Sequence, residues 1–320
     1  MLSVLLATHN GADTIERTLA AMSELDAPAG GWKLVVVNNA STDDSEALIL
    51  KWRDRLPLEY LVEPRLGKSN AINTALDRAE GDFIIMTDDD VLPERNWLTE
   101  WRRMADSYPE ISVFGGAIVP AFEVPPPSWL VDDGCFGPLY GRSPPVPEGR
   151  FDDDMLLHFN IPIAGANLAI RAAIRDRGWR FGANFMVGAN GLMGEDSDFV
   201  RRIWSGGHQV GWAPNARIRH IIQKHQMTWA WIQRRVFRHG RFQFIQEEVS
   251  RDAATNRSVF RFPKWRIRKC GEILLHLGKA LVKRDSTRVF QESQALVYHL
   301  GAISQAWTLV KQERSFPFLK

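Results

Sequence analysis

Cysteine is scarce in this sequence. The 320 residues contain two, Cys135 and Cys270, which lie far apart and outside any CxxC motif or His/Cys cluster. The sequence therefore gives no indication of a disulfide framework or of a structural zinc site. This cysteine usage is typical of a reducing, cytosolic compartment.

Long hydrophobic runs are also missing. No stretch reaches the roughly 18 uninterrupted apolar residues that a membrane-spanning helix needs. The start, Met1–Leu6, is apolar and strand-like, without a basic region or a small-residue cleavage site of the kind that secretory signals carry. We therefore expect a cytoplasmic protein, either soluble or peripheral on the inner face of the cell membrane. With 45% hydrophobic residues, the chain can bury one large core or two coupled ones.

Charge is distributed unevenly, although the net charge is only +2. Residues 1–216 carry 19 Lys+Arg and 31 Asp+Glu, whereas residues 217–320 carry 21 and 7. A basic region of this kind binds nucleic acid or anionic lipid, or pairs with the acidic half, and composition alone does not choose. Because no nucleic-acid-binding signature accompanies the charge, we expect no nucleic-acid partner.

Strand-like and helical patterns alternate along the first 120 residues. The expected strands are Leu2–Ala7, Lys33–Val37, Leu58–Val62 and Phe83–Thr87, and the expected helices are Ala12–Leu25, Asp43–Arg53 and Lys68–Ala79. This rhythm predicts an α/β fold whose mostly parallel central sheet is flanked by helices.

Proline interrupts the rhythm over residues 120–150, which contain eight prolines as well as Trp129, Phe136 and Tyr140. The composition predicts a long ordered loop, either binding an acceptor or only packing on the surface. Beyond it we expect a strand at Ile163–Arg171, a helix at Asp196–Ser205, short strands at Gln209–Trp212 and Ala216–Ile222, and mostly helix from Thr228 onward with breaks at Pro263 and near Asp285.

Three consecutive carboxylates, Asp88, Asp89 and Asp90, follow the apolar run Phe83–Met86. They would repel one another without a cation, and ligands of open α/β sheets bind at the carboxyl ends of the strands. A hard divalent cation held there would neutralise the charge on a leaving diphosphate. The alternative is a solvated turn whose aspartates cap the next helix.

A second acidic motif, Glu195 and Asp196, begins a predicted helix after the glycine-rich segment Gly188–Gly191. The helix dipole keeps carboxylates ionised at this position, which suits a general base that faces an acceptor hydroxyl. Purely structural capping residues also favour this position, so both interpretations stay open.

Seven motifs in order resemble glycosyltransferase family 2, whose members are inverting enzymes with a GT-A fold. They are LLATHN (5–10), VVVNNASTD (35–43), GKSNAINTAL (67–76), GDFIIMTDDD (81–90), GANLAIR (165–171), GEDSDFVRR (194–202) and APNARIRH (213–220). The resemblance covers about residues 1–240, and its specificity comes from order and spacing. It implies a Rossmann-like catalytic domain over 1–225, with a nucleotide-sugar half at 1–119 and an acceptor half at 120–225, and a basic helical region at 226–320.

The resemblance also implies roles for individual residues on the donor side. Thr8 and Asn10 would lie beside the nucleotide, and Asp88 near its ribose. Asp90 would hold Mn²⁺ or Mg²⁺ as the last member of a DxD motif, and Asp89 is the alternative ligand. Lys68, in the GKSNAINTAL motif, belongs to the same donor-binding set.

On the acceptor side, Asp196 is similar to the catalytic base of the family, with Glu195 supporting it. His220 matches a histidine that approaches the metal or the diphosphate in some members, although a structural role is equally open. Arg234 or Arg235 would meet the diphosphate. The alternative for both arginines is to cover an apolar helix face or to pair with the acidic half.

Two departures from the family pattern bear on substrate use. Asn38 stands where members usually carry an aspartate that reads the base, so a preference for uridine is not assured. The QxxRW motif of processive members is absent from residues 223–229, which read QKHQMTW, so we expect one sugar to be added per encounter.

The predicted function is therefore metal-dependent, inverting transfer of one sugar from a nucleotide-diphosphate sugar to a glycan or polyprenyl-linked acceptor in polysaccharide or glycolipid synthesis. A UDP-sugar is the expected donor. A nucleotidyltransferase or a non-catalytic sugar-nucleotide binding module is the alternative. Residues 257–284 combine apolar and basic residues as an interfacial helix does, so an anionic membrane surface is a further expected partner. Packing of this segment on the core or on a second subunit is the competing interpretation, and the sequence does not determine an oligomeric state.

Overall fold

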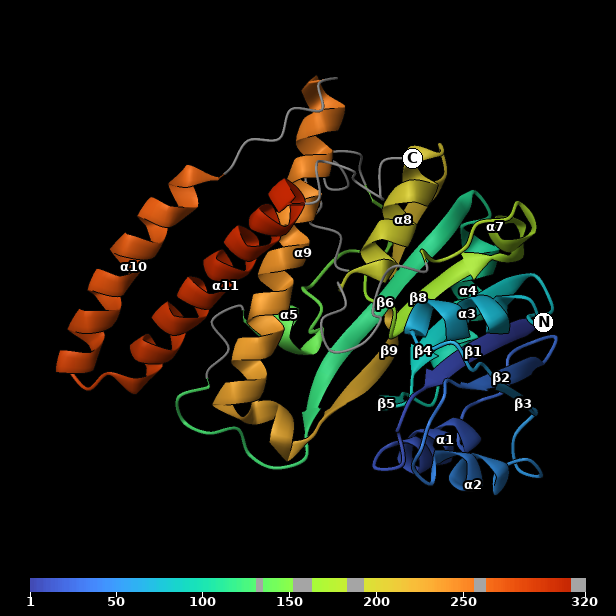
Figure 1. Ribbon diagram of the computed structural model, residues 1–320. Coiled ribbons are helices and arrows are strands. Elements are labelled where there is room, and N and C mark those ends of the chain that lie inside the picture. Colours follow the sequence, from blue (N-terminus) through green and yellow to red (C-terminus); the bar gives the residue numbers. More distant parts are fainter. Residues whose placement is uncertain (131–134, 152–162, 183–192, 256–262, 312–320) are drawn as a thin grey trace. The chain divides into compact units, whose positions relative to one another are not determined.

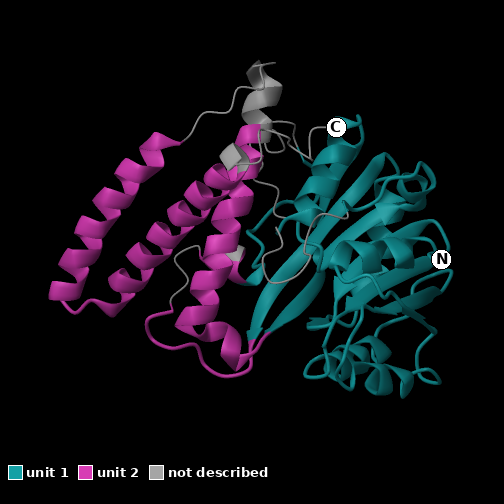
Figure 2. Cartoon of the chain, viewed as in Figure 1, with its two compact units in different colours: residues 1–121, 140–221 teal, residues 122–139, 222–320 magenta. Residues whose placement is uncertain are grey.

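The computed structural model describes residues 1–130, 135–151, 163–182, 193–255 and 263–311. The chain forms two compact units, one of residues 1–121 and 140–221 and the other of residues 122–139 and 222–320 (Figure 2). The predicted segment Gly188–Gly191 and residues 257–262 of the predicted basic segment lie outside the described residues. The second unit takes in 122–139, part of the region that the sequence interpretation assigned to the acceptor half.

A mixed sheet forms the centre of the first unit (Figure 1). Its strands in the described residues are β1 (Leu2–Thr8), β2 (Trp32–Asn38), β3 (Leu58–Val62), β4 (Phe83–Asp88), β5 (Val91–Pro93), β6 (Ile111–Phe122), β7 (Gly149–Arg150), β8 (Asn167–Arg171) and β9 (Gln209–Ile222). They follow the order β3-β2-β1-β4-β8-β6-β9-β5, with β7 paired to β9. The neighbouring strands β3, β2, β1 and β4 are all parallel, and β8 continues the sheet antiparallel to β4. The predicted α/β class is confirmed.

Helices cover both faces of this sheet, as its doubly buried strands require. They are α1 (Ile15–Ser23), α2 (Ser45–Leu50), α3 (Lys68–Leu76), α4 (Trp97–Ser107), α7 (Ala172–Asp176) and α8 (Glu195–Ser205). One apolar cluster joins side chains of α1, α2 and α4 to one face, and a second cluster joins α3, α7 and α8 to the other. β1 supplies alternate residues to the two clusters, Val4 to the first and Leu5 to the second, as the pleat of a strand dictates.

A buried asparagine connects the antiparallel strands. Asn167 Nδ2 donates to the carbonyl oxygens of Ala117, 2.9 Å away, and Ala216, 2.8 Å away, and its Oδ1 accepts from the Trp97 indole at 2.9 Å. A Cβ on Gly116 would lie 2.3 Å from Asn167 Nδ2, so glycine is required there for β6 to approach. Both the oxygen and the nitrogen of this buried side-chain amide therefore have hydrogen-bond partners.

Two predicted boundaries differ from the structure for clear reasons. β9 is one strand through Pro214, where a break was predicted, because it pairs with β7 on one side of the proline and with β5 on the other. β8 begins at Asn167, four residues later than predicted. A turn precedes it, closed by the Asn167 amide donating to the Ala164 carbonyl at 3.0 Å.

The Pro-rich region is less irregular than predicted. β6 extends to Phe122, a short helix α5 spans Phe136–Tyr140, and β7 adds Gly149–Arg150. Most of its prolines fall between these elements, where no ladder hydrogen bond is lost.

The second unit is helical, as expected. It contains the 3₁₀ turn η1 (Lys224–Met227) and the helices α9 (Trp229–Thr255), α10 (Lys264–Val282) and α11 (Ser286–Lys311), with α11 between α9 and α10 (Figure 1). The predicted breaks at Pro263 and near Asp285 coincide with the starts of α10 and α11. In the described part of the chain, no helix combines the length and hydrophobicity needed to cross a bilayer.

Glycines set the distance between α9 and α11. A Cβ on Gly240 would lie 2.0 Å from the Tyr298 carbonyl oxygen, and one on Gly301 would lie 2.1 Å from that of Phe237. The backbones of these two helices therefore approach closely because side chains are absent from both.

Candidate active site

The carboxyl ends of three parallel strands meet at one edge of the sheet. Thr8 at the end of β1 is level with Asn38 at the end of β2, and Ala7 is level with Asp88 at the end of β4. Parallel pairing therefore brings together three of the predicted donor-side residues, Thr8, Asn38 and Asp88. This edge is where open α/β sheets bind their ligands.

Asp89 is held against the loop after β1. Its Oδ2 accepts a short hydrogen bond from Thr8 Oγ1. A Cβ on Gly11 would lie 2.2 Å from the same Asp89 oxygen and 2.3 Å from Thr8 Oγ1, so glycine is needed there. Burial, followed by the negative charge of Asp90, raises the pKa of Asp89 to about 7, against the opposing effect of the Thr8 hydrogen bond.

Asp90 faces His220 because β5 pairs with β9. Val91 is level with His220 in that ladder, and the Ile221 amide donates to the Asp90 carbonyl at 2.7 Å. Asp90 Oδ2 lies 3.1 Å from His220 Nε2, and His220 Nδ1 lies 2.7 Å from the Tyr140 carbonyl oxygen. Nδ1 must therefore be the donor to Tyr140.

This pair influences both ionisations. Burial lowers the pKa of His220, but the Asp90 carboxylate outweighs it and the net shift is upward. Burial raises the pKa of Asp90, and His220 outweighs it so that the net shift is downward. Each group thus favours the charged form of the other.

The Asp90 and His220 side chains fit the predicted cation. Asp90 Oδ1 is buried without a hydrogen-bond partner, so the lone pairs of one carboxylate oxygen are unused. The Tyr140 carbonyl fixes the histidine ring as the hydrogen-bond partners of metal-binding histidines do, and Nε2, which faces Asp90 Oδ2 at 3.1 Å, would coordinate a cation only after losing its proton. Among the described residues, no group of three or more His, Cys, Asp or Glu is arranged around a common metal position. Water and the substrate diphosphate would have to complete the shell.

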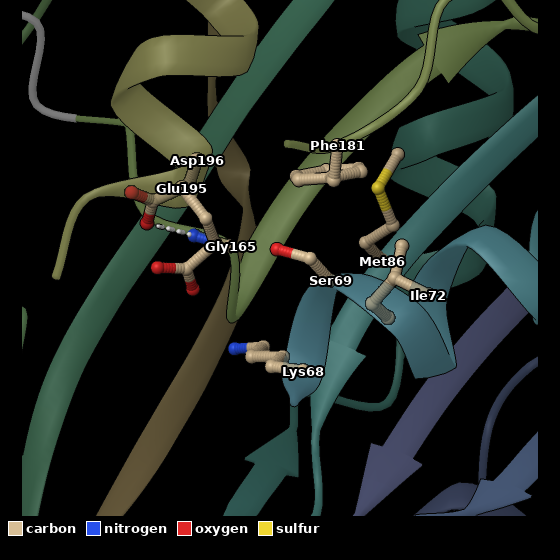
Figure 3. A pocket seen from close by; sticks show the side chains of 8 residues that line it. All are labelled: Lys68, Ser69, Ile72, Met86, Gly165, Phe181, Glu195 and Asp196. Atoms are coloured by element: carbon tan, nitrogen blue, oxygen red, sulfur yellow. Dashed lines mark hydrogen bonds between the residues drawn. The ribbon is translucent and has the colours of Figure 1, made fainter. Parts of the chain in front are cut away.

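Lys68, at the start of α3, links the two acidic motifs. Its ammonium pairs with Asp88 Oδ1, and it lies in a pocket with Glu195 and Asp196 (Figure 3). Burial lowers the pKa of Lys68, but the charges of Asp88, Glu195 and Asp196 outweigh it and raise the pKa overall. The lysine therefore stays protonated between carboxylates from β4 and α8.

Asp196 is oriented by backbone amides. Its Oδ2 accepts from the Gly165 N–H at 2.7 Å, and its Oδ1 accepts from the Ser197 N–H, also at 2.7 Å. Oδ1 also accepts from the Ser197 hydroxyl at 3.5 Å, whereas Oδ2 keeps a second lone pair that can take a proton. Burial, then the charge of Asp196, raises the pKa of neighbouring Glu195 to about 7. The expectation that the helix dipole keeps both carboxylates ionised is therefore wrong for Glu195, because burial outweighs the dipole. Of the two, Asp196 is the half-buried carboxylate and Glu195 the buried one.

The opposite side of this pocket is apolar, with Ile72, Met86 and Phe181 (Figure 3). Phe181 stacks on Phe199 of α8 with ring centroids 4.0 Å apart. Asn73 exchanges two hydrogen bonds of 2.9 Å with the Phe181 backbone, which fixes this aromatic wall to α3. The pocket thus combines charged groups with an apolar wall, as small-molecule sites do.

Asn38 and Asn10 organise the loops at the same edge. Asn38 Nδ2 donates to the Tyr60 hydroxyl at 3.0 Å, and its Oδ1 accepts from the Ser41 amide at 3.1 Å. Asn10 has a positive φ of 54° and accepts from the Thr42 amide at 2.8 Å. Both amides are therefore oriented by the protein, and their contacts to a nucleotide stay predictions.

Arg234 and Arg235 lie on α9 in the second unit. Arg234 Nε donates to the Ala230 carbonyl of its own helix at 3.2 Å, and the Arg235 guanidinium lies 5.5 Å from the centre of the Trp231 ring. Their predicted contact with a diphosphate stays a prediction.

Sequence reasoning missed a second layer behind the site. Asn39 Nδ2 donates to the carbonyls of Glu63 and Arg65, at 2.9 and 2.8 Å, and its Oδ1 accepts from the Gly67 amide at 2.8 Å. Hydrogen bonds from Arg65 lower the pKa of Glu63 to about 2. These contacts fix the segment that leads into Lys68. Nothing in the sequence around Glu63 indicates this supporting role. By contrast, Gly11, which packs against Asp89, could have been found from its place directly after Thr8, His9 and Asn10.

The family comparison decides the identity. The model of "Glycosyl transferase family 2" matches residues 3–164, which is half of the chain. The chain belongs to glycosyl transferase family 2. This glycosyltransferase is similar over 229 residues, at 23% identity, to the succinoglycan biosynthesis protein ExoM of Rhizobium meliloti. That match covers 71% of this chain and 69% of ExoM.

A second relative is the poly(ribitol-phosphate) beta-N-acetylglucosaminyltransferase TarS of Staphylococcus aureus. It is 32% identical over 90 residues, which are 28% of this glycosyltransferase and only 16% of TarS. That sequence match therefore covers only a small part of TarS.

Solved structures confirm the GT-A-like fold. The mannosyltransferase PcManGT of Pyrobaculum calidifontis, solved with GDP-Man and Mn²⁺, superposes with a TM-score of 0.61 at 21% identity, covering 96% of this chain and 87% of that one. S. aureus TarS 1-349 in complex with UDP-GlcNAc superposes with a TM-score of 0.53 at 15% identity, covering 98% and 93%. At these identities the likeness establishes the fold alone.

Proposed function

We propose that this glycosyltransferase transfers one hexosyl or N-acetylhexosaminyl group, with inversion, from a nucleotide-diphosphate sugar to a hydroxyl of a glycan or polyprenyl-linked acceptor. The observation that carries the proposal is the meeting of the two acidic motifs at Lys68. Asp88 comes from β4 and Asp196 from α8, and the same lysine lies against both. The donor's diphosphate and the acceptor's hydroxyl thus have separate acidic neighbours within one site.

In the proposed reaction, Asp196 removes the proton from the acceptor hydroxyl. The acceptor oxygen then forms a bond to the anomeric carbon on the face opposite the leaving group. The bond between that carbon and the diphosphate oxygen breaks, and its electron pair leaves with the nucleotide diphosphate. The amides of Gly165 and Ser197 orient the base for this single displacement.

Asp90 and His220 are the residues we assign to a divalent cation, Mn²⁺ or Mg²⁺. When bound, such a cation neutralises charge on the departing diphosphate. The unpartnered Asp90 Oδ1 and the backbone-anchored His220 support this assignment. PcManGT was solved with GDP-Man and Mn²⁺, and TarS with UDP and with UDP-GlcNAc. UDP- and GDP-sugars are therefore the first donors to test.

A role in polysaccharide synthesis is proposed from the named relatives. ExoM is a succinoglycan biosynthesis protein, and TarS is a poly(ribitol-phosphate) beta-N-acetylglucosaminyltransferase. Both names refer to polymers, so a growing glycan or its lipid-linked precursor is the acceptor class that we propose.

The deciding experiment measures thermal unfolding with UDP, GDP or CDP, each with and without Mn²⁺, on the unaltered protein and on Asp90→Ala. We expect one nucleotide to raise the unfolding temperature only with the metal, and the rise to vanish in the variant. Asp82→Ala, which removes a carboxylate just before β4 and away from the site, should keep the rise. No stabilisation by any of the three nucleotides would contradict the proposal. A product assay with the corresponding sugar donors then identifies the sugar.

A further inference from the structure

The outer side of α10 exposes an unusual amount of apolar surface. Its exposed apolar side chains are Trp265, Ile267, Leu274, Leu275, Leu281 and Val282, and the exposed fraction runs from 53% at Ile267 to 87% at Val282. Elsewhere in the described residues such side chains occur singly or in small numbers per element. The inner side of the same helix is buried instead, through Cys270, Ile273 and Ala280 against α11.

Helical spacing gathers most of these exposed residues into a strip. Ile267, Leu274 and Leu281 recur every seventh residue, and Leu275 and Val282 follow the last two directly. At 3.6 residues per turn, this spacing places all five on one side of the helix. Gly271 and Gly278 lie in the same strip, and a Cβ on either would meet nothing within 4 Å. No described part of the chain therefore covers the strip.

Positive charge borders the strip on the side away from α11. Lys264, Arg268 and Lys279 are exposed there and make no ion pair with any described residue. The single acidic residue of α10, Glu272, is 3.0 Å from Lys269 and is neutralised by it. Arg266 is directed inward and is paired with Glu247. The exposed face is thus apolar and basic with no uncompensated negative charge.

This charge distinguishes between the possible occupants of the face. A second copy of α10 would bring the same basic residues against each other, and like charges repel. An anionic bilayer accepts both properties, because phosphate groups attract the lysines and arginines while the strip enters the boundary of the acyl chains. We propose that the outer face of α10 is the docking surface for an anionic lipid bilayer, with the helix lying in the plane of the interface.

The test is flotation of the full-length protein with lipid vesicles. One set contains phosphatidylcholine alone, and the other contains phosphatidylcholine with roughly a third of phosphatidylglycerol, which supplies the anionic charge. We expect binding to the anionic vesicles to exceed binding to the neutral ones by about tenfold or more, and to fall as NaCl increases, because charge and apolar contact act together. Equal binding to the two sets, or binding to neither, would overturn the proposal.

Variants locate the contact. Leu274→Gln with Leu281→Gln should weaken binding to the anionic vesicles about tenfold or more, since the strip loses its central apolar groups. Leu300→Gln, a matched change at an exposed leucine of α11, should bind as the unaltered protein does. The substituted side chains are exposed, so an unchanged unfolding temperature shows that the loss is not a folding defect. Unchanged binding by the double variant would contradict the assignment to α10.

Adding side chains at the glycines separates a bilayer from a second copy. Gly271→Leu with Gly278→Leu fits the fold because a Cβ meets nothing at either position. It should strengthen vesicle binding by enlarging the apolar strip, whereas it would prevent close packing of two α10 helices. A dimer in analytical ultracentrifugation that this variant dissociates, without any vesicle binding, would assign the face to a second copy and overturn the proposal. Loss of transferase activity in solution is not expected in these variants, so the result is independent of the proposed function.

Discussion

Each compact unit contains a cluster of charged side chains, and the two clusters differ in how far positive and negative charges cancel. In the first unit, Lys68 is surrounded by Asp88, Glu195 and Asp196, so negative charge is in excess. In the second unit, Arg266 is 1% exposed and its charge is matched by one glutamate. Its Nη2 donates to both oxygens of Glu247, at 2.7 and 2.6 Å, and its Nη1 lies 2.9 Å from His299 Nδ1.

The net charge of each cluster distinguishes a ligand site from a structural clamp. A balanced ion pair needs no ligand to neutralise its charge, although Arg266 Nε is buried without a hydrogen-bond partner. Arg266 adds aromatic contacts, with its guanidinium 4.6 Å from the centre of the Trp265 ring and 5.6 Å from that of Tyr298. An excess of buried carboxylates is costly unless something positive or protonated joins them. The upward pKa shifts of Asp89 and Glu195 express that cost. Unbalanced charge therefore marks the ligand site.

The sharpest test compares two aspartates on α8. Asp196→Asn should lower kcat by about 10³-fold, because the proposed base is lost while the side-chain shape is kept. Asp198→Asn is the control, since Asp198 is balanced by Arg201 at 3.0 Å and Arg202 at 2.8 Å. Its kcat should stay within a few fold, and its unfolding temperature should fall. Steady-state kinetics and thermal unfolding measure both, and a fully active Asp196→Asn protein would remove Asp196 from the mechanism.

Changing the balanced cluster around Arg266 should reduce the stability of the protein and leave its transferase activity in place. Arg266→Ala should reduce the free energy of unfolding by about 3 kcal/mol, because Glu247 and His299 lose their partner and the aromatic contacts disappear. Lys269→Ala breaks only an exposed pair with Glu272, so its cost should stay within about 0.5 kcal/mol. Urea unfolding of the two variants measures the contrast. Equal costs would show that Arg266 is not a clamp.

The unbalanced cluster predicts a pH dependence. The folded state raises the pKa of Glu195 to about 7, so it holds this proton more tightly than the unfolded chain does. Stability should therefore fall as pH rises from about 4.5 to about 7, with a contribution from this group of about 3 kcal/mol. Glu195→Gln should match the unaltered protein at about pH 5 and exceed its stability at about pH 8.

A control isolates that contribution. Asp89 shifts in the same direction and is present in both proteins, so the difference between them reports Glu195 together with its coupling to Asp196. Glu16→Gln changes an exposed glutamate of α1 and should leave the pH dependence as it is. The free energy of unfolding is measured with urea between about pH 5 and pH 8. If it changes with pH in the same way for the unaltered protein and for Glu195→Gln, the pKa of Glu195 is not raised.

The smallest effect concerns two glycines in the second unit. Gly278→Ala should raise the free energy of unfolding by up to about 1 kcal/mol, because the new Cβ meets nothing and alanine favours helix. Gly301→Ala should lower it by about 1 to 3 kcal/mol, since its Cβ would overlap the Phe237 carbonyl. Thermal unfolding should show opposite signs. Stabilisation by both changes would mean that α9 and α11 are less closely packed than described.

Patterns within the amino-acid sequence are enough to predict the fold class, the family and the two acidic motifs. Periodicity carries this information because β1 to β4 and their helices bury apolar residues at the spacing of each element, and the aspartates follow β4 directly. The break at Pro263 was equally readable, since proline cannot continue a preceding helix. Single elements and short motifs are therefore encoded by the residues within them.

Which side chains meet in the site depends on contacts between segments that are distant in the sequence. The pairing of β5 with β9 places His220 beside Asp90, and the turn before β8 directs the Gly165 amide to Asp196. The role of Asn39 behind Lys68 and the match of Arg266 with Glu247 depend on contacts between distant segments in the same way. Such contacts depend on strand register and helix packing, which no local pattern encodes. The pKa of each carboxylate, and with it the chemistry of the site, follows from those contacts.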